Sequence, residues 1–298
     1  AVLSPGAAGE RDAMGISAIT VSFQTGPVLI ECLDALIGAP EIDEIVLIDN
    51  GNPPDVETWL DARAATEPRL RVVRGRGNIG FGAACNLGAS HAVGQKLLFI
   101  NPDVVLAPGA AARMAEALAA ARAPALIGGD VRDAHGEPDR GSRRDRVTLW
   151  SAFVAFSGLS RFERFAPVFR DLHRHGDPLP ESAAEIANVS GALMMLSREG
   201  FAALGGFDEG YFLHAEDIDL CWRAANAGGQ VLFQPGAIGA HARSTSAAPS
   251  RDIERHKAMG LARFFVKSAR SPVERMAAML VGAVLKLVLP ARAARPAL

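Results

Sequence analysis

The sequence is poor in cysteine and has no large excess of charge of either sign. Its 298 residues include three cysteines, Cys32, Cys85 and Cys221, whose scattered positions match no metal-binding motif. They suit a reducing compartment, and we expect them to be small buried apolar residues. The formal net charge is −2, whereas a dedicated nucleic-acid-binding protein would have a strong basic excess. The composition therefore argues against a nucleic-acid partner and favours a cytoplasmic location.

Long apolar runs are also missing. The longest is MAAMLVGAVL, residues 276–285, which Lys286 interrupts before it reaches the length of a membrane span. The first 15 residues lack the charged start and apolar run of a secretory signal, and we expect a disordered N-terminal lead there. With 49% hydrophobic residues, the chain can form one large core or two modest ones.

Short aliphatic runs alternate with helical segments over the first hundred residues. Strands are predicted at 16–23, 44–50, 70–75 and 96–104, and the segments between them have apolar residues at helical spacing. This α/β alternation predicts a Rossmann-like, mostly parallel central sheet flanked by helices. Ligands bind such sheets beyond the carboxyl ends of the strands, so the polar residues after each run are expected to line one crevice.

The second half of the chain is less regular. An Ala-rich helix is predicted at 109–122, followed by an exposed loop rich in Arg, Asp and Gly, whereas residues 147–185 have too weak a periodicity for assignment. A buried strand is predicted at 188–197, and acids in the first turn mark a helix in HAEDIDLCWRAANAGG, residues 214–229. Two helices end the chain, the second of which opens with a capping box and a proline at its first position, Ser271-Pro272-Val273-Glu274.

A glycine motif leaves two interpretations open. Gly75, Gly77 and Gly80 have the G-x-G-x-x-G spacing of a dinucleotide-binding turn, and Asp103 lies about 20 residues further on. That turn normally follows the first strand of its fold, whereas here it follows the third. Asp103 ends an Asn-Pro-Asp turn, which suits a metal-binding carboxylate better than a ribose-binding one. An NAD(P)-dependent oxidoreductase is therefore the less favoured alternative, and no catalytic Tyr-Lys pair is evident around Tyr211, the only tyrosine.

An ordered set of motifs resembles the family 2 inverting glycosyltransferases of the GT-A fold. The set is TVSFQ, VLIDNG, GNIGFGAACNLG, FINPDV, SGALMMLS and GGFDEGYFLHAEDIDLCWRAANAG, followed by His241. The resemblance covers residues 16–250 and is strongest to the bacterial rhamnosyltransferase-like branch, which has Asn-Pro-Asp where many relatives have Asp-x-Asp. It implies a nucleotide-binding half (16–104), an acceptor and catalytic half (105–250) and a C-terminal helical extension (251–298).

The resemblance also implies a nucleotide-sugar site. Asp49 would accept the ring N–H of a pyrimidine, with a plain turn at Asp49-Asn50-Gly51 as the alternative. The other donor-binding residues implied are Thr20, Ser22, Phe23, Asn50, Asn78, Gly80, Phe81, Asn86, Asn101 and Asp103. For the acceptor, Gly191 would permit close approach, or only relieve packing. The remaining acceptor candidates are Trp222 and Arg143, the latter within a basic cluster that can also be a solvated surface.

Two carboxylates are predicted to carry the chemistry. Asp103 would bind Mn²⁺ or Mg²⁺ as the divalent cofactor, because hard ions that prefer oxygen ligands can bridge the donor phosphates. The resemblance implies His241 as a second ligand, and Asn101 in place of the first acid weakens the site electrostatically. Asp217 would be the catalytic base that takes the proton of an acceptor hydroxyl, with Glu216 orienting the acceptor. Acids in a first helical turn can also be mere dipole partners.

The resemblance thus implies a metal-dependent inverting hexosyltransferase of envelope polysaccharide synthesis. Its donor would be a dTDP- or UDP-sugar, with dTDP-L-rhamnose as the first candidate, and its acceptor a glycan or lipid-linked glycan. A non-catalytic nucleotide-sugar-binding or glycan-binding relative is the alternative. The helix at 272–289 is apolar nearly all round with cations nearby. It is expected to lie peripherally on the inner face of the cell membrane or to pack against protein, including a second subunit.

Overall fold

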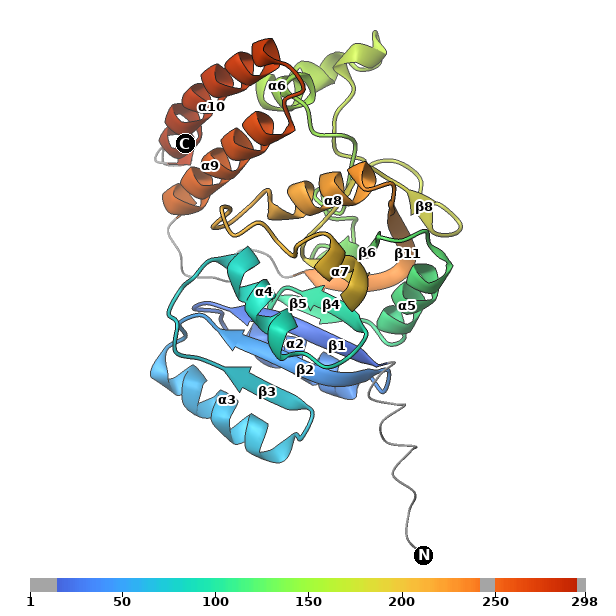
Figure 1. Cartoon of the computed structure of the whole chain (residues 1–298), viewed down its shortest axis with the longest axis vertical. Coiled ribbons are helices and arrows are strands. Elements are labelled where there is room, and N and C mark those ends of the chain that lie inside the picture. Colours follow the sequence, from blue (N-terminus) through green and yellow to red (C-terminus); the bar gives the residue numbers. More distant parts are fainter. Residues whose placement is uncertain (1–14, 242–249, 294–298) are drawn as a thin grey trace, which may run out of the picture.

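A computed structural model of the chain describes residues 15–241 and 250–293. The predicted N-terminal lead lies almost entirely outside the described residues. The strands form one nine-stranded sheet in which eight follow the order β3-β2-β1-β4-β10-β6-β11-β5 and β8 pairs with β11, and β7 and β9 pair separately. Helices lie on both faces of the large sheet, and a helical hairpin extends from one end of the molecule (Figure 1).

The first part of the sheet is parallel, as predicted. Strand β1 pairs with β2 and β4, and β2 pairs with β3, all in parallel. Each crossover contains a helix or helical segment, since parallel neighbours need a long connection. The elements are β1 (Ile16–Ser22), α2 (Val28–Gly38), β2 (Ile42–Asp49), α3 (Pro54–Thr66), β3 (Leu70–Val73), α4 (Phe81–His91) and β4 (Lys96–Ile100).

The predicted strand at 96–104 ends early, at Ile100. The N–H of Val104 donates to the carbonyl of Asn101 at 3.1 Å, closing the Asn-Pro-Asp turn. The chain then enters β5, which pairs antiparallel with β11, so that Val104 lies opposite His241. The next elements are β5 (Val104–Leu106), α5 (Ala110–Ala120), β6 (Ala125–Arg132) and β7 (Arg143–Arg144).

The segment predicted as an exposed Arg/Asp/Gly-rich loop is instead partly buried. Asp130 and Ser142 are fully buried, and Arg143 is 4% exposed because its guanidinium donates to the carbonyls of Asp177 and Pro178. The unassigned residues 147–185 begin with a helix. They contain α6 (Leu149–Ser157), the 3₁₀ turns η1 (Leu159–Phe162) and η2 (Pro167–Phe169), and β8 (Ala184–Glu185).

The predicted strand at 188–197 is two strands separated by a turn. β10 is inserted antiparallel between β4 and β6, which makes the sheet mixed. The predicted helix at 214–229 begins at Glu216, and a long strand, β11, follows it. These elements are β9 (Asn188–Val189), β10 (Leu193–Ser197), α7 (Arg198–Ala203), α8 (Glu216–Asn226) and β11 (Gln230–His241).

Three buried apolar clusters hold these layers together. One packs α2, α3 and α5 on one face of the sheet, and the second packs α4, α7 and α8 on the other. The third joins α6, α8 and the C-terminal helices α9 (Ser250–Ser268) and α10 (Pro272–Ala293). The three cysteines are buried free thiols, as predicted, and burial raises the pKa of Cys32 and Cys221 to about 12.

The two predicted C-terminal helices are confirmed. The Oγ of Ser271 accepts a hydrogen bond from the N–H of Glu274 at 3.1 Å, which caps α10 as its sequence predicts. Helices α9 and α10 pack closely, since a side chain at Gly282 would lie 2.8 Å from the Cβ of Ala262. None of the helices in the described ranges combines the length and hydrophobicity needed to span a bilayer.

Candidate active site

Two adjoining cavities lie beyond the carboxyl ends of β1, β2 and β4, where the fold predicts a ligand. The strand-end cavity, of about 650 Å³, contains Asp103, and the α8 cavity, of about 490 Å³, contains Asp217. Both are lined by Phe81, Asn101, Leu213, His214 and His241. The two carboxylates that the sequence predicts as metal ligand and base therefore belong to adjacent compartments with a shared wall.

The strand-end cavity gathers most of the predicted donor-binding residues. Asn50 holds the glycine loop against the end of β2, because its Nδ2 donates to the Oδ1 of Asn78 at 3.1 Å. Gly80 has a φ of +87°, and a Cβ there would lie 2.6 Å from the carbonyl oxygen of Phe212, so only glycine fits. The predicted residues that line this cavity are Phe23, Asn50, Asn78, Gly80, Phe81, Asn101 and Asp103.

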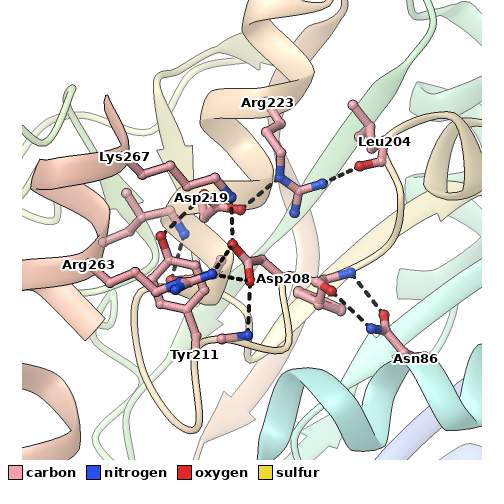
Figure 2. A network of polar contacts seen from close by, with 12 residues as sticks. Asn86, Leu204, Asp208, Tyr211, Asp219, Arg223, Arg263 and Lys267 are labelled. Carbon is pink, nitrogen blue, oxygen red and sulfur yellow. Dashed lines mark hydrogen bonds and ion pairs between the residues drawn. The ribbon is translucent and has the colours of Figure 1, made fainter. Parts of the chain in front are cut away.

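Four other predicted donor residues lie outside the lining of this cavity. Asp49 is buried, and its carboxylate accepts from the N–H groups of Gly51 and Asn52, from Asn52 Nδ2 and from Arg74 Nε. The amide of Asn86 is paired with the backbone of Phe207 at 2.8 and 2.9 Å (Figure 2). Thr20 and Ser22 are fully buried in β1. Contact between these side chains and a nucleotide stays a prediction. The observed hydrogen bonds of Asp49 and Asn86 instead hold in place the chain segments next to the cavity.

His241 lies between two carboxylates in the part of the strand-end cavity where the sequence predicts a metal site. Its Nε2 is 3.2 Å from Asp103 Oδ1 and its Nδ1 is 3.2 Å from Asp139 Oδ2. Burial opposes the charged imidazolium, but the two carboxylates outweigh it and raise the pKa of His241 to about 9. The ladder between β5 and β11 brings Asp103 and His241 together, although they are distant in sequence.

The residues at this end fit a divalent cation chemically. A carboxylate and a neutral imidazole suit Mn²⁺, so a bound cation would displace the Nε2 proton that the two carboxylates favour. Asp139 would orient the ring through its other nitrogen, as partners of metal-bound histidines commonly do. No group of three or more His, Cys, Asp or Glu side chains in residues 15–241 and 250–293 is arranged as a complete metal site. The protein would therefore supply few ligands, as expected where phosphate oxygens supply others.

Asp217 is held firmly at the start of α8. Its Oδ2 accepts from Arg144 Nη2 at 2.5 Å and from the N–H of Gly191 at 3.1 Å, and its Oδ1 accepts from the N–H of Ile218 at 2.8 Å. Gly191 leaves little spare room, since a Cβ there would lie 3.3 Å from the Cβ of Asp217. Gly191 thus contacts the predicted base and lines the α8 cavity with it.

The neighbouring carboxyl groups of Asp217 and Glu216 have opposite pKa shifts. Burial opposes the ionisation of Asp217, but the Arg144 cation and the backbone donors outweigh it and lower the pKa of Asp217. Burial, and then the charge of Asp217, raise the pKa of Glu216 to about 8. Near neutral pH the pair therefore comprises an ionised aspartate and a largely protonated glutamate, a division typical of groups with different catalytic roles.

The Arg144→Met variant is expected to move the acid limb of the pH–activity profile to higher pH. Without the cation, burial raises the pKa of Asp217, and a base acts only above its pKa. In kcat/KM profiles measured between about pH 5 and pH 8, wild type should be nearly flat on the acid side and the variant should decline. Arg146→Met, at a nearby exposed position, is the matched control. Superimposable profiles for all three proteins contradict this role of Arg144.

Two predicted acceptor residues lie elsewhere. Arg143 and Trp222 line a separate cavity of about 590 Å³ that includes neither Asp217 nor Gly191. The ring of Trp222 packs edge-on against Phe264 of α9, with 6.3 Å between ring centroids. The structure therefore does not bring these two side chains together with Asp217, and an acceptor role for them stays a prediction.

Sequence reasoning did not single out Asp139 or His214, and it named Arg144 only as part of the basic cluster with Arg140 and Arg143. Asp139 and Arg144 come from the segment predicted to be an exposed loop, and no signal in the sequence marks their long-range partners. His214 lies within a recognised motif, lines both cavities and has a left-handed φ of +70°. Its Nε2 is buried without a hydrogen-bond partner among the described residues. Burial, and then the charge of Lys257, lower the pKa of His214 to about 4, so the imidazole is neutral near pH 7.

A polar network behind the α8 cavity fixes α8 and the turn before it to α9 (Figure 2). Asp219 is fully buried and contacts Arg223 Nε and Lys267 Nζ, each at 2.7 Å. Lys267 also contacts Asp208 at 2.7 Å, as does Arg263 at 2.8 Å. Although burial opposes it, these cations and a backbone N–H lower the pKa of Asp208 to about 2. Lys267 thus bridges two acids on either side of the turn that precedes α8.

Comparisons with known proteins agree with this geometry. Residues 17–199 match the family model of Glycosyl transferase family 2. N-acetylglucosaminyl-diphospho-decaprenol L-rhamnosyltransferase of Mycobacterium tuberculosis (strain CDC 1551 / Oshkosh) is 28% identical over 254 residues, covering 80% of each chain. Rhamnosyltransferase WbbL of Escherichia coli (strain K12) is 38% identical over 52 residues, which are 17% of this chain and 20% of that relative.

Solved structures confirm the predicted GT-A fold. GalNAc-T7 with UDP, GalNAc and Mn²⁺ has a TM-score of 0.61 and 16% identity over 92% of this chain, which spans 55% of that protein. Mannosyltransferase PcManGT from Pyrobaculum calidifontis, in complex with GDP-Man and Mn²⁺, has a TM-score of 0.57 and 18% identity over 96% of this chain and 77% of its own. At these identities the likeness concerns the fold alone.

Proposed function

Because this chain belongs to glycosyl transferase family 2, we propose that it transfers L-rhamnose from dTDP-L-rhamnose to a lipid-linked glycan, with inversion at the anomeric carbon. The observation that carries this proposal is the pair of adjoining cavities, one with Asp103 and His241 and the other with Asp217. The donor sugar and acceptor follow the name of the mycobacterial relative, an L-rhamnosyltransferase of a diphospho-decaprenol-linked sugar.

In the proposed reaction, the nucleotide occupies the strand-end cavity and the acceptor the α8 cavity. An acceptor hydroxyl oxygen forms a bond to the anomeric carbon while the bond from that carbon to the donor phosphate oxygen breaks. Asp217 takes the hydroxyl proton, and the nucleoside diphosphate leaves with the electron pair of the broken bond. A single displacement of this kind inverts the configuration at the anomeric carbon.

The surrounding side chains prepare the groups for this step. Arg144 and the N–H of Gly191 hold the carboxylate of Asp217 ionised and fixed in orientation. Protonated Glu216 can donate a hydrogen bond from the same cavity, and its Oε2 has no hydrogen-bond partner among the described residues. When bound, Mn²⁺ or Mg²⁺ at Asp103 and His241 supplies charge neutralisation for the leaving diphosphate. Asp139 keeps His241 oriented for that role.

A panel of dTDP-, UDP- and GDP-sugars tests the donor assignment. With Mn²⁺ present, dTDP-L-rhamnose is expected to raise the melting temperature most, since a ligand that binds only the folded state stabilises it. The same donors are then assayed for transfer to a diphosphate-lipid-linked N-acetylglucosamine. Stabilisation without hydrolysis or transfer identifies a non-catalytic sugar-nucleotide-binding protein instead. Greater stabilisation and transfer with another donor contradicts the rhamnose assignment alone.

A further inference from the structure

Exposed apolar side chains are concentrated in two segments that lie at the same end of the molecule (Figure 1). Twelve of the seventeen large apolar residues exposed in the described ranges belong to residues 149–170 or to α10. Both segments pack their inner sides into the third apolar cluster. We call their outer side the apolar face. It comprises Trp150, Phe153, Phe162, Phe165, Val168, Val273, Met276, Met279, Leu280, Val284, Leu287 and Val288.

The position of α10 in the fold explains part of why its sequence is apolar nearly all round. Ala278, Gly282, Leu285 and Leu289 form a buried stripe, with Gly282 close against α9. Val273, Met276, Leu280, Val284 and Leu287 recur at spacings of three or four residues and form an exposed stripe on the outer side. The docking on the catalytic domain that the sequence allowed therefore accounts for one stripe of the helix, and the other is left facing outward.

Cations are interspersed along this face. The guanidinium of Arg161 lies 4.7 Å from the ring centroid of Phe162, and that of Arg164 lies 4.6 Å from that of Phe165. A groove of about 1020 Å³ between α9 and α10 is lined by four cations, of which Arg263 and Lys267 are paired with Asp208 and Asp219, and the other two are Arg275 and Lys286. Against these, residues 149–170 contain one acid, Glu163, and α10 contains one, Glu274. The surface around the exposed apolar residues is therefore basic.

We propose that the apolar face docks on the headgroup region of an anionic lipid bilayer. Exposed aromatic and aliphatic side chains interleaved with Arg and Lys are what an anionic interface attracts, through apolar insertion and phosphate pairing together. A second copy of the chain fits less well. A two-fold dimer would place this face against itself and bring the cations of both copies together.

The apolar face also adjoins the proposed acceptor site. Helix α6 exposes Trp150 and Phe153 on its outer side, whereas Ala152, Ala155 and Phe156 of the same helix line the α8 cavity. A bilayer against the apolar face would therefore lie behind one wall of the cavity that contains Asp217. This link to a lipid-linked acceptor rests on the proposed function, but the docking itself does not.

Vesicle cosedimentation tests the docking. The full chain is expected to bind phosphatidylglycerol vesicles and to bind pure phosphatidylcholine vesicles far less. The double variant Leu280→Glu, Leu287→Glu should bind about tenfold more weakly or worse, and Phe165→Glu should also weaken binding. These side chains are 69%, 75% and 70% exposed, so the fold should tolerate the changes. Ile30→Glu, an exposed apolar position on α2, is the matched control.

Three results overturn the proposal: no binding of wild type to anionic vesicles, equal binding by the double variant, or equal loss of binding in the Ile30→Glu control. Light scattering adds a further outcome, because a dimer that the double variant dissociates would assign the apolar face to a second copy. Melting temperatures identify any variant that fails to fold, and Lys286→Glu then serves as a replacement on the same face. Vesicle binding without rhamnose transfer would reject the proposed function while leaving the docking intact.

Discussion

The Asp217→Asn variant is expected to lose transfer activity by about 10² to 10⁴-fold, the usual contribution of a positioned general base. Asparagine has nearly the same shape, and its one carbonyl oxygen can still accept a backbone hydrogen bond from Gly191 or Ile218. It cannot take the proton of the acceptor hydroxyl, and it removes the ionic partner of Arg144. Because Asp217 lies in the α8 cavity, donor binding in the strand-end cavity should be retained.

This expectation is checked by two measurements on the same preparation. Transfer is followed with labelled donor, and donor affinity by calorimetry with Mn²⁺ present. Asp145→Asn is a matched control, since Asp145 is a half-exposed carboxylate that lines the separate cavity with Arg143. Full transfer activity in Asp217→Asn rejects the assignment of the base. Lost donor binding in the same variant would instead point to a collapse of the wall between the cavities.

The Asp103→Ala variant is expected to weaken metal-dependent donor binding by about ten- to a hundredfold, in the range seen when metal sites lose supporting groups. The variant removes the carboxylate that lies 3.2 Å from His241 Nε2 and with it the proposed oxygen ligand. Calorimetry with dTDP, in the presence and absence of Mn²⁺, measures the effect. The difference between the two conditions should be large in wild type and small in the variant.

Asp34→Ala, at an exposed carboxylate on α2, controls for a general loss of negative charge. Chelation of the metal should reduce wild type to the behaviour of Asp103→Ala. If dTDP binds wild type equally well with and without Mn²⁺, neither Asp103 nor His241 has the proposed role. A variant that keeps its full Mn²⁺ dependence would place the metal on other residues.

The parts of the fold that depend on local pattern could be predicted from the sequence. The strands β1 to β4 and their helices follow from apolar periodicity within each segment, so they were found with small errors at their ends. The antiparallel insertion of β10 between β4 and β6 depends on contacts between distant segments, which periodicity does not encode. The same limitation explains why β7, two residues long, was missed, and why β9 was not separated from β10 within the strand predicted at 188–197.

The prediction of individual site residues was limited because the sequence does not show in which direction a side chain points. Arg143 and Arg144 are neighbours in β7, and successive side chains in a strand point to opposite sides. Sequence reasoning placed Arg143 at the acceptor, whereas Arg144 pairs with Asp217 and Arg143 donates to carbonyls elsewhere. Asn86 shows the same limitation, because its amide pairs with the Phe207 backbone rather than lining a cavity. A motif identifies a polar residue, but not which neighbour it contacts.

The bridge formed by Lys267 has a consequence for how the chain can be divided. A shortened protein that stops at the sequence-predicted boundary of residue 250 would lose both Lys267 and Arg263, leaving fully buried Asp219 with Arg223 as its remaining cation. Leaving a buried charge without any partner costs about 3 to 5 kcal/mol, a large share of the stability of a typical domain. The loss here should be smaller, because Arg223 still pairs with Asp219 and Lys267 is 31% exposed. Truncated versions made for crystallisation or for grafting onto other transferases should therefore retain α9, since the catalytic half folds against it.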